Sequence, residues 1–215
     1  MEHPRATYAA MVSRLDREVG RVLQHLRQLN LVGNTVVFFC SDNGAPNPAG
    51  VADFFGSTAG FRGKKSSLLE GGIRTLMIVR WPGQVPAGKR SDYAWGGWDF
   101  LPTAAALAGA VPPPGVDGSN VLPGLRGETA TRSGYFYWEH HQKAFAQAVR
   151  EGRLKALRES PTDPIQVYDL VADPGETRNL ADREPAFVRR ATELFASARS
   201  ESEHWPIAKR PKKTP

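Results

Sequence analysis

Asp42 and Asn43 are the first residues of this sequence whose types and placement could do chemistry. They follow the β-branched and aromatic run TVVFFC at residues 35–40, and Gly44 comes directly after them. A carboxylate beside an amide oxygen offers the hard oxygen ligands that Ca²⁺ or Mg²⁺ prefers. The alternative is a tight hairpin turn, since Asn-Gly is a common turn sequence. Residues 45–63 lack strand periodicity and so offer no hairpin partner, which favours the metal site.

A basic pair, Lys64 and Lys65, lies between this region and a second apolar stretch, TLMIV, at residues 75–79. A lysine close to a divalent metal makes an anion site, because the ammonium adds a point charge to the charge of the metal. The alternative is a solvated surface loop, which is the commoner place for paired lysines.

Two adjacent histidines, His140 and His141, end the aromatic stretch SGYFYWEHHQ at residues 133–142. They could line a substrate pocket, or they could mark an exposed end of a strand. In a strand, side chains alternate between the two faces, so only one of these histidines can lie on a given face.

The elements that must position these residues follow from the apolar pattern. A stripe with spacings of three and four residues predicts a long amphipathic helix. Its members are Tyr8, Met11, Leu15, Val19, Val22, Leu26 and Leu29. The run at 35–40 has no alternation, which is typical of a strand covered on both faces in a parallel sheet. Asp42 and Asn43 would then lie beyond the carboxyl end of a strand, where open α/β sheets bind ligands. Cys40, inside the run, is expected to be buried.

The C-terminal part has a different pattern. Alternation around Glu151-Gly152 predicts a β-hairpin, and an amphipathic helix is expected from about 185 to 202. We therefore predict an α/β portion with a partial parallel sheet at 1–132. A small α+β portion with antiparallel strands and a final helix follows at 133–207, and a basic tail at 208–215.

Composition limits the classes of partner. Hydrophobic residues make up 40% and charged residues 23%, as in ordinary globular proteins, and the net charge is +6. The basic residues are spread out except in the tail, for which a solvated end is favoured over a nucleic-acid contact. We therefore expect no nucleic acid as partner. No apolar run is long enough to cross a bilayer, so we do not expect a membrane as partner either.

Several stretches resemble, in order, the sulfatase family, of arylsulfatase type within the alkaline phosphatase superfamily. These are SDNG (41–44), FRGKKSSLLEGGIRTLMIVRWPG (61–83) and WDFLPTAAALAG (98–109). Two further stretches are similar to that family's C-terminal hairpin and closing segment: YWEHHQKAFAQAVREGRLKALR (137–158) and VYDLVADPGETRNLA (167–181). The resemblance covers about residues 8–194, and the order of five motifs makes it specific.

The resemblance implies a fold, an activity and a site. It implies an alkaline-phosphatase-like α/β fold and hydrolysis of a sulfate ester, either an aryl or a carbohydrate sulfate. It also implies a divalent cation, usually Ca²⁺ and otherwise Mg²⁺, with Asp42 and Asn43 matching the family's metal ligands. The family's sulfate-contacting lysine stands five residues before the Glu of its EGG segment, which assigns the catalytic and substrate-binding role to Lys65. His140 and His141 match a stretch that binds substrate in some members.

The chain departs from the family in several respects that concern catalysis. The paired aspartates that complete the family's metal site have no counterpart here, nor do its upstream Lys and His that act on the leaving group. The family's nucleophile is formylglycine, made from a Cys/Ser-x-Pro-x-Arg motif that does not occur in these 215 residues. Cys40 precedes Ser-Asp-Asn and is not that residue. We therefore expect the chain to correspond to the C-terminal half of a sulfatase, to be inactive alone and to require an N-terminal half as partner. The alternatives are a non-catalytic remnant, a related phosphoesterase or phosphonate hydrolase, and a basic interaction module that uses the tail.

Overall fold

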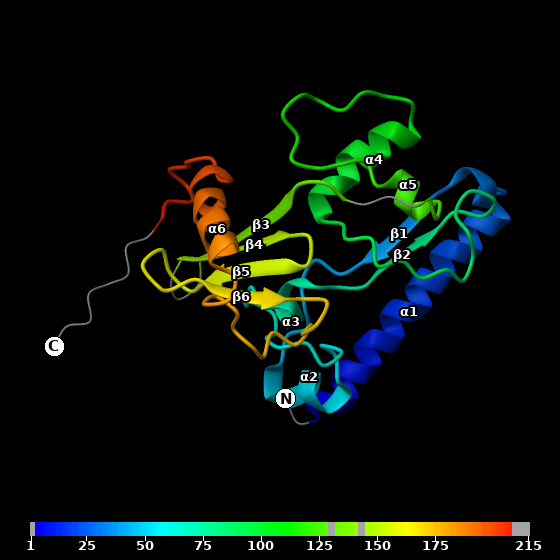
Figure 1. The fold of residues 1–215 in the computed structure, drawn as a ribbon. Coiled ribbons are helices and arrows are strands. Elements are labelled where there is room, and N and C mark those ends of the chain that lie inside the picture. The colour runs from blue at the N-terminus through cyan, green and yellow to red at the C-terminus, as the bar shows by residue number, and fades with distance from the viewer. Residues whose placement is uncertain (1–2, 129–131, 142–144, 208–215) are drawn as a thin grey trace. The chain divides into compact units, whose positions relative to one another are not determined.

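The structure, a computed structural model, describes residues 3–128, 132–141 and 145–207 (Figure 1). The chain forms two compact units, which are described separately. Unit 1 consists of Met1–Asp42 and Leu76–Arg132, and unit 2 of Asn43–Thr75 and Ser133–Pro215. Residues 43–75 thus group with the C-terminal part of the chain. The domains predicted at 1–132 and 133–207 remain predictions, and the basic tail at 208–215 lies outside the described residues.

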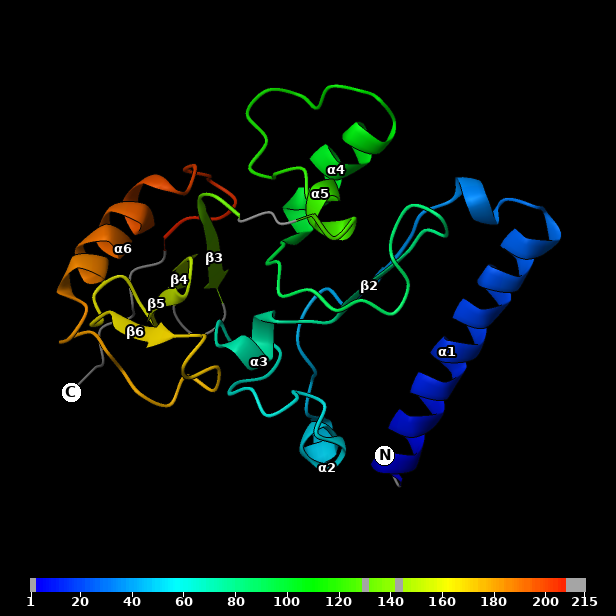
Figure 2. The same cartoon turned by 45° about the vertical axis from the view of Figure 1, so that its right-hand side comes forward.

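Unit 1 begins with α1 (Pro4–Gln28), which confirms the predicted amphipathic helix (Figure 2). Pro4 stands in the first turn, where its missing N–H costs nothing. None of the residues of α1 is buried, so its apolar stripe faces solvent in this chain. Met11, for example, is 65% exposed. The stripe therefore identified the helix correctly without identifying a packing partner for it.

The two strands of unit 1, β1 (Val37–Cys40) and β2 (Met77–Arg80), pair antiparallel, with Val37 opposite Arg80. The expectation of a parallel pairing for these two strands was wrong. An apolar run shows that a strand is suited to burial, but the connection between two strands decides their relative direction. Here residues 43–75 return without a long crossover helix, which a parallel connection usually contains.

The same strands are not covered on both faces within this chain. Ile78 on β2 is 58% exposed, and Cys40 at the end of β1 is exposed rather than buried as expected. Phe38 packs against two aromatic rings of the same unit, with Phe100 edge-on at 5.4 Å and Trp95 stacked at 6.0 Å. These contacts hold β1 against the later part of unit 1.

Unit 1 also contains short helices and a buried aspartate, Asp99. The helices are η1 (Val32–Asn34), η3 (Gly97–Asp99), α4 (Phe100–Leu107) and α5 (Leu122–Leu125). Asp99 accepts backbone N–H bonds from Gly96 and Ser119, both at 2.7 Å, and forms an ion pair with Arg132 at 2.5 Å. A buried carboxylate needs such partners because its desolvation is costly.

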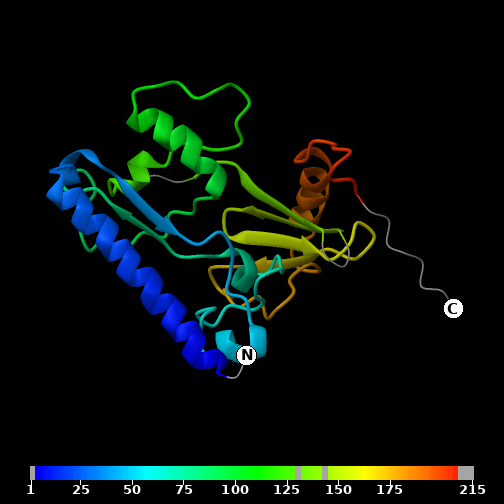
Figure 3. The same cartoon turned by 180° about the vertical axis from the view of Figure 1, so that it is seen from behind.

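Unit 2 contains a four-stranded antiparallel sheet whose strands follow one another in space as in sequence (Figure 3). The strands are β3 (Tyr135–His141), β4 (Phe145–Glu151), β5 (Leu154–Arg158) and β6 (Gln166–Asp169). Gly152, with φ of 60°, makes the turn of the predicted hairpin between β4 and β5. The final helix α6 (Pro185–Ser197) ends a little before the predicted position. The antiparallel strands and the final helix are thus confirmed.

Alternation along the strands gives this sheet two covered faces. On one face the side chains pack against α6; this core comprises Val149, Ala156, Val167, Phe187, Ala191, Leu194 and Phe195. On the other face Ala148 and Leu157 pack against Leu68. Leu68 belongs to the segment before α3 (Glu70–Ile73), and that segment also carries the lysine pair. Unit 2 contains two more short helices, η2 (Pro48–Gly50) and α2 (Val51–Phe55).

Candidate functional site

The loop that carries Asn43 and Gly44 is pressed against the double glycine of the EGG segment. The N–H of Gly44 donates to the carbonyl oxygen of Gly72 at 2.8 Å. A Cβ atom at Gly44 would lie 1.9 Å from the carbonyl oxygen of Gly71. Only glycine permits this approach, which explains the glycine after the Asp-Asn pair without a hairpin turn.

The double glycine admits a second segment in the same way. A Cβ at Gly71 would meet the carbonyl oxygen of Gly63 at 2.2 Å, and one at Gly72 would meet that of Ser67 at 2.1 Å. The N–H of Gly71 donates to the carbonyl oxygen of Arg62 at 2.7 Å. The loop at residues 62–67 therefore closes around the start of α3, because the second and third residues of α3, Gly71 and Gly72, have no side chain.

Lys65 joins these two segments through its backbone. Its N–H donates to the carbonyl oxygen of Ala45 at 3.1 Å, which places Lys65 beside the loop of Asn43. Its side chain is exposed and has no ion pair or hydrogen bond among the residues that the structure describes. The geometry leaves this ammonium available for an anion.

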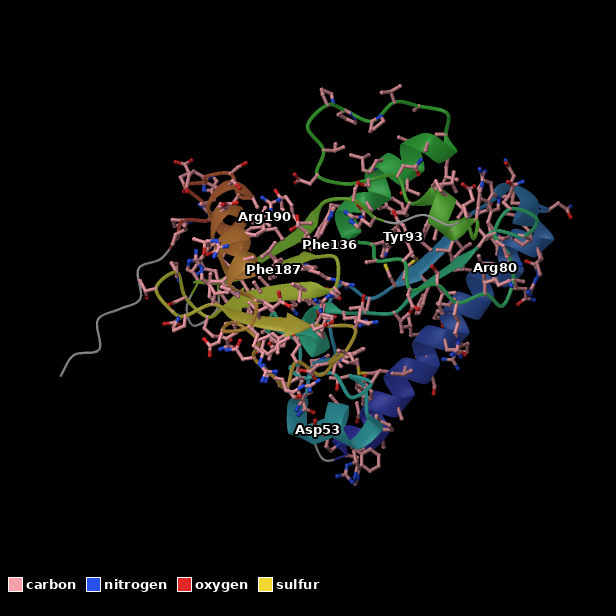
Figure 4. The ribbon with its side chains drawn as sticks, viewed as in Figure 1. Asp53, Arg80, Tyr93, Phe136, Phe187 and Arg190 are labelled. Carbon is pink, nitrogen blue, oxygen red and sulfur yellow. The ribbon has the colours of Figure 1, made fainter. Side chains whose placement is uncertain are left out.

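Lys64 differs from its neighbour in this respect. Its Nζ lies 2.8 Å from Oδ1 of Asp53, and Asn47 donates to the same carboxylate at 2.9 Å. The hydrogen bond from Lys64 holds the pKa of Asp53 below its usual range, with Asn47 adding to the effect. Figure 4 labels Asp53 on α2. Lys64 thus ties the loop to α2, whereas Lys65 does not.

Asp42 is exposed and Asn43 is half-buried. Their oxygens suit Ca²⁺ or Mg²⁺ in kind but not in number, because Ca²⁺ takes six to eight oxygen ligands. Within 3–128, 132–141 and 145–207, no group of three or more His, Cys, Asp or Glu side chains could hold a metal ion. The pair therefore fits part of a cation site rather than a whole one.

The two histidines of β3 lie on opposite faces of the sheet, as alternation requires. His141 contacts the rings of Phe145 and Trp205 at 5.6 and 5.4 Å, and its Nε2 lies 3.2 Å from the carbonyl oxygen of Pro206. His140 pairs with Ala146 on the face that the Lys65 segment covers. His140 therefore lies on the same side of the sheet as the segment that follows Lys65, and His141 on the other side.

The structure also shows three buried charged residues that sequence reasoning missed: Glu70, Lys155 and Glu176. Nζ of Lys155 lies 2.9 Å from a carboxylate oxygen of each glutamate. The N–H of Glu70 donates to Oε2 of Glu176 at 2.6 Å. The signal in the sequence was a lysine between apolar residues in the strand LKALR, since a buried lysine requires a partner of opposite charge.

None of the helices in the described part of the chain combines the length and apolar character needed to cross a membrane.

Comparisons with known proteins extend these observations over nearly the whole chain. The sulfatase family model matches residues 1–110, and that of the N-sulphoglucosamine sulphohydrolase C-terminal region matches residues 60–196. Steryl-sulfatase of Mus musculus is 34% identical over 90% of this chain and 36% of its own length. N-acetylgalactosamine-6-sulfatase of Sus scrofa is 38% identical over 80% of this chain and 38% of its own length.

Solved structures agree with the sequence comparisons. The crystal structure of Ps i-CgsB superimposes with a TM-score of 0.81 at 31% identity, covering 94% of this chain and 45% of that one. These likenesses confirm the alkaline-phosphatase-like α/β fold class. The chain spans 36% of the length of the first of these curated relatives. By its family match, the order of its motifs and its fold, the chain belongs to the sulfatase family.

Proposed function

We propose that this chain supplies metal ligands and a sulfate-binding lysine to a sulfuric ester hydrolase. The observation that carries the proposal is the hydrogen bond from the N–H of Lys65 to the carbonyl oxygen of Ala45. It holds the backbone of Lys65, whose side chain is exposed, next to the loop that begins with Asn43. The family membership supports the same assignment, since the five motifs include both segments.

In this proposal each residue has a distinct part. Asp42 and Asn43 would hold Ca²⁺ or Mg²⁺ together with ligands from outside the pair, and such an ion withdraws negative charge from a sulfuryl oxygen. Lys65 donates a charge-assisted hydrogen bond to the sulfate and stabilises the charge that develops as the ester bond breaks. His140 lies on the sheet face that the Lys65 segment covers and would contact the alcohol portion of the substrate. The contacts of His141 with Trp205 and Pro206 make it a weaker candidate for this role.

The nucleophile would come from outside these 215 residues, which lack the Cys/Ser-x-Pro-x-Arg motif. Covalent catalysis requires an activated nucleophile at the sulfur atom. The partner would therefore be a sulfatase segment that carries this motif, and the chain alone would be inactive.

Carbohydrate sulfate esters are the favoured substrate class, with aryl sulfates as the alternative. One relative is an N-acetylgalactosamine-6-sulfatase, and a second structure of Ps i-CgsB is a complex with k-i-k-neocarrahexaose. Both names describe those proteins; for this chain they guide the choice of substrates to assay.

The test combines binding and turnover. The chain is titrated with sodium sulfate at constant ionic strength, and the amide shifts of residues 43–46 and 62–67 are followed by NMR. We expect saturable shifts that Lys65→Ala abolishes and that the matched variant Lys64→Ala retains. A loss of binding with Lys64→Ala but not with Lys65→Ala would contradict the assignment.

Turnover is assayed with 4-methylumbelliferyl sulfate and a galactosamine-6-sulfate. We expect none from the chain alone, and turnover when a sulfatase segment carrying the formylglycine motif is added. That activity should disappear with Lys65→Ala and with a chelator. Turnover by the chain alone, or equal turnover of a phosphate monoester, would refute the proposed division of roles.

A further inference from the structure

Unit 2 encloses an ion cluster that the proposed reaction does not use. Lys155 and Glu176 are 0% exposed and Glu70 is 3% exposed. Nζ of Lys155 hydrogen-bonds Oε1 of Glu70 at 2.9 Å; it lies equally close to Oε1 of Glu176, but without hydrogen-bond geometry. Arg74, half exposed, approaches the other oxygen of Glu70 at 3.7 Å.

The cluster joins three parts of the unit that are distant in sequence. Lys155 comes from β5, and Glu176 from the loop after β6, where its φ is 54°. Glu70 is the first residue of α3 and directly precedes Gly71 and Gly72. The ion contacts of Glu70 therefore fix the two glycines against which the Asn43 and Lys65 loops pack.

A buried cluster of this kind is better explained by geometry than by stability. Replacing a whole buried ion network with neutral residues of similar size is often neutral for stability, whereas removing one partner is strongly destabilising. The cluster carries two negative charges and one positive charge, a net charge of −1, with Arg74 nearby and Arg150 close enough for Glu70 to act on its pKa. Burial is the larger influence and lowers the pKa of Arg150. The cluster supplies a hydrogen-bonded ion pair of defined geometry between Glu70 and Lys155 on β5 of the sheet.

We propose that Lys155 is a positioning residue for the anion site: through Glu70 and Glu176 it fixes the EGG segment and so presents Lys65. This inference rests on the proposed function, because it assigns the cluster a part in sulfate binding. Lys155 does not touch the sulfate; it acts by limiting the motion of the loops that do. A site held rigid before its ligand arrives loses less entropy on binding.

The test is the double variant Lys155→Met/Glu176→Gln in the full chain. It leaves one buried carboxylate, Glu70, beside Arg74, so the net charge of the cluster stays at −1. Hydrogen exchange is measured at the amides of Gly44, Lys65 and Gly71 and, as a reference, at Val149 in the middle of β4. The matched control is Val167→Ala, which removes buried side-chain volume on the α6 face of the same sheet.

We expect the double variant to fold and to lose about tenfold protection at the three loop amides relative to Val149, as a local opening would produce. The dissociation constant for inorganic sulfate should rise in parallel, by roughly threefold or more, through the lost preorganisation. Val167→Ala should lower protection evenly and leave sulfate affinity unchanged. If both variants lose protection equally at the loop amides and at Val149, the cluster has only a structural role and the proposal is overturned.

A second variant covers the case in which the double variant fails to fold. Glu176→Gln keeps an oxygen that can accept the N–H of Glu70 and removes one charge. We expect a smaller effect confined to the same loop amides; an unchanged ratio to Val149 and an unchanged sulfate affinity would refute positioning. If Lys65→Ala leaves sulfate binding intact while the loop amides still respond to the cluster, the proposed function fails but the mechanical link stands.

Discussion

At the scale of single residues, the site depends on positions that lack a side chain. Gly44 and Gly71 allow two backbone segments to approach at distances that a Cβ atom would forbid. The neighbouring atoms in both cases are backbone carbonyl oxygens, which cannot rotate away as the end of a long side chain can. Small substitutions should therefore act strongly here and weakly at an open glycine of the same unit.

Gly44→Ala tests this contrast against Gly175→Ala. The Cβ at Gly44 would lie 1.9 Å from a carbonyl oxygen, whereas that at Gly175 meets its nearest neighbour at 3.5 Å. We expect Gly44→Ala to lower the free energy of unfolding by about 3 kcal/mol or more, and Gly175→Ala to change it by about 0.5 kcal/mol or less. Urea denaturation of both variants measures the difference, and equal effects would contradict the packing described.

Asp173 gives unit 2 a specific acid sensitivity. Its carboxylate accepts the N–H of Arg178 at 2.8 Å, and that of Thr177 at 2.8 Å with the Thr177 hydroxyl at 3.0 Å. These bonds, that to Arg178 foremost, hold the pKa of Asp173 below its usual value of 3.8. A carboxylate with a lowered folded-state pKa stabilises the protein above its unfolded-state pKa, and that contribution disappears as pH falls through the folded value.

Asp173→Asn should therefore flatten the dependence of stability on pH below about 4 while leaving an oxygen to accept one N–H. The measurement is the midpoint of urea unfolding between pH 6 and pH 2.5. Asp182→Asn, at an exposed position of the same unit, serves as control. If the urea midpoint of the variant falls between pH 6 and pH 2.5 as steeply as that of the parent chain, the lowered pKa of Asp173 has no stabilising effect.

The sequence indicated candidate residues that short motifs reveal. It did not indicate which residues from distant parts of the chain would contact one another after folding. Asp42, Asn43 and Lys65 were singled out from their types and from a spacing relative to Glu70, and their roles remain predictions. The exposure of Cys40 could not be foreseen, because an apolar run does not report whether both of its faces are covered. The cluster of Glu70, Lys155 and Glu176 required knowledge of which strand lies over which loop.

At the scale of elements, periodicity identified α1, the β4–β5 hairpin and α6, because each has an amphipathic pattern within a short window. It did not give the direction of β1 relative to β2, which depends on a connection that contains no long helix. Periodicity likewise did not show which residues cover the two faces of the unit 2 sheet. Alternation predicts two faces, but the occupants of each face come from elsewhere in the chain.

Helix α6 offers a matched test of which of its sides carries the stability. Phe187 is 8% exposed in the core against the sheet, whereas Arg190 pairs with Glu151 at 3.2 Å on the surface (Figure 4). Phe187→Ala should lower the free energy of unfolding by about 3 kcal/mol through lost burial and a cavity. Arg190→Ala should lower it far less, because exposed ion pairs contribute little to stability. Comparable losses would mean that α6 is not held by its apolar face.

At the scale of the whole molecule, the two units differ in how much apolar surface they bury. Unit 2 has a core on each face of its sheet, whereas unit 1 has many exposed apolar side chains. Unit 2 has its sheet covered on both sides, whereas α1 of unit 1 has no buried residue. Leu15 and Val22, on the stripe of α1, are 54% and 59% exposed. Exposed apolar stripes of this kind promote association.

We therefore expect the double variant Leu15→Gln/Val22→Gln to reduce self-association of the chain at high concentration. Its free energy of unfolding should change by about 0.5 kcal/mol or less, as for other exposed positions. Sedimentation velocity at rising concentration measures the effect, and Arg17→Gln, on the polar side of the helix, is the control. If the control and the double variant associate like the parent chain, the stripe is not the contact.

The ion cluster also bears on how this protein is made. Glu70 precedes Lys155 by 85 positions and Glu176 by 106. A ribosome that adds about 5 to 20 residues each second reaches Lys155 roughly 4 to 17 seconds after it has placed Glu70. During that interval the carboxylate of Glu70 lacks Lys155 and its backbone N–H lacks the carboxylate of Glu176, so the EGG segment cannot take its buried place. The anion loop is thus completed by residues translated long after it, and a nascent chain interrupted before position 176 would expose that loop without its anchor.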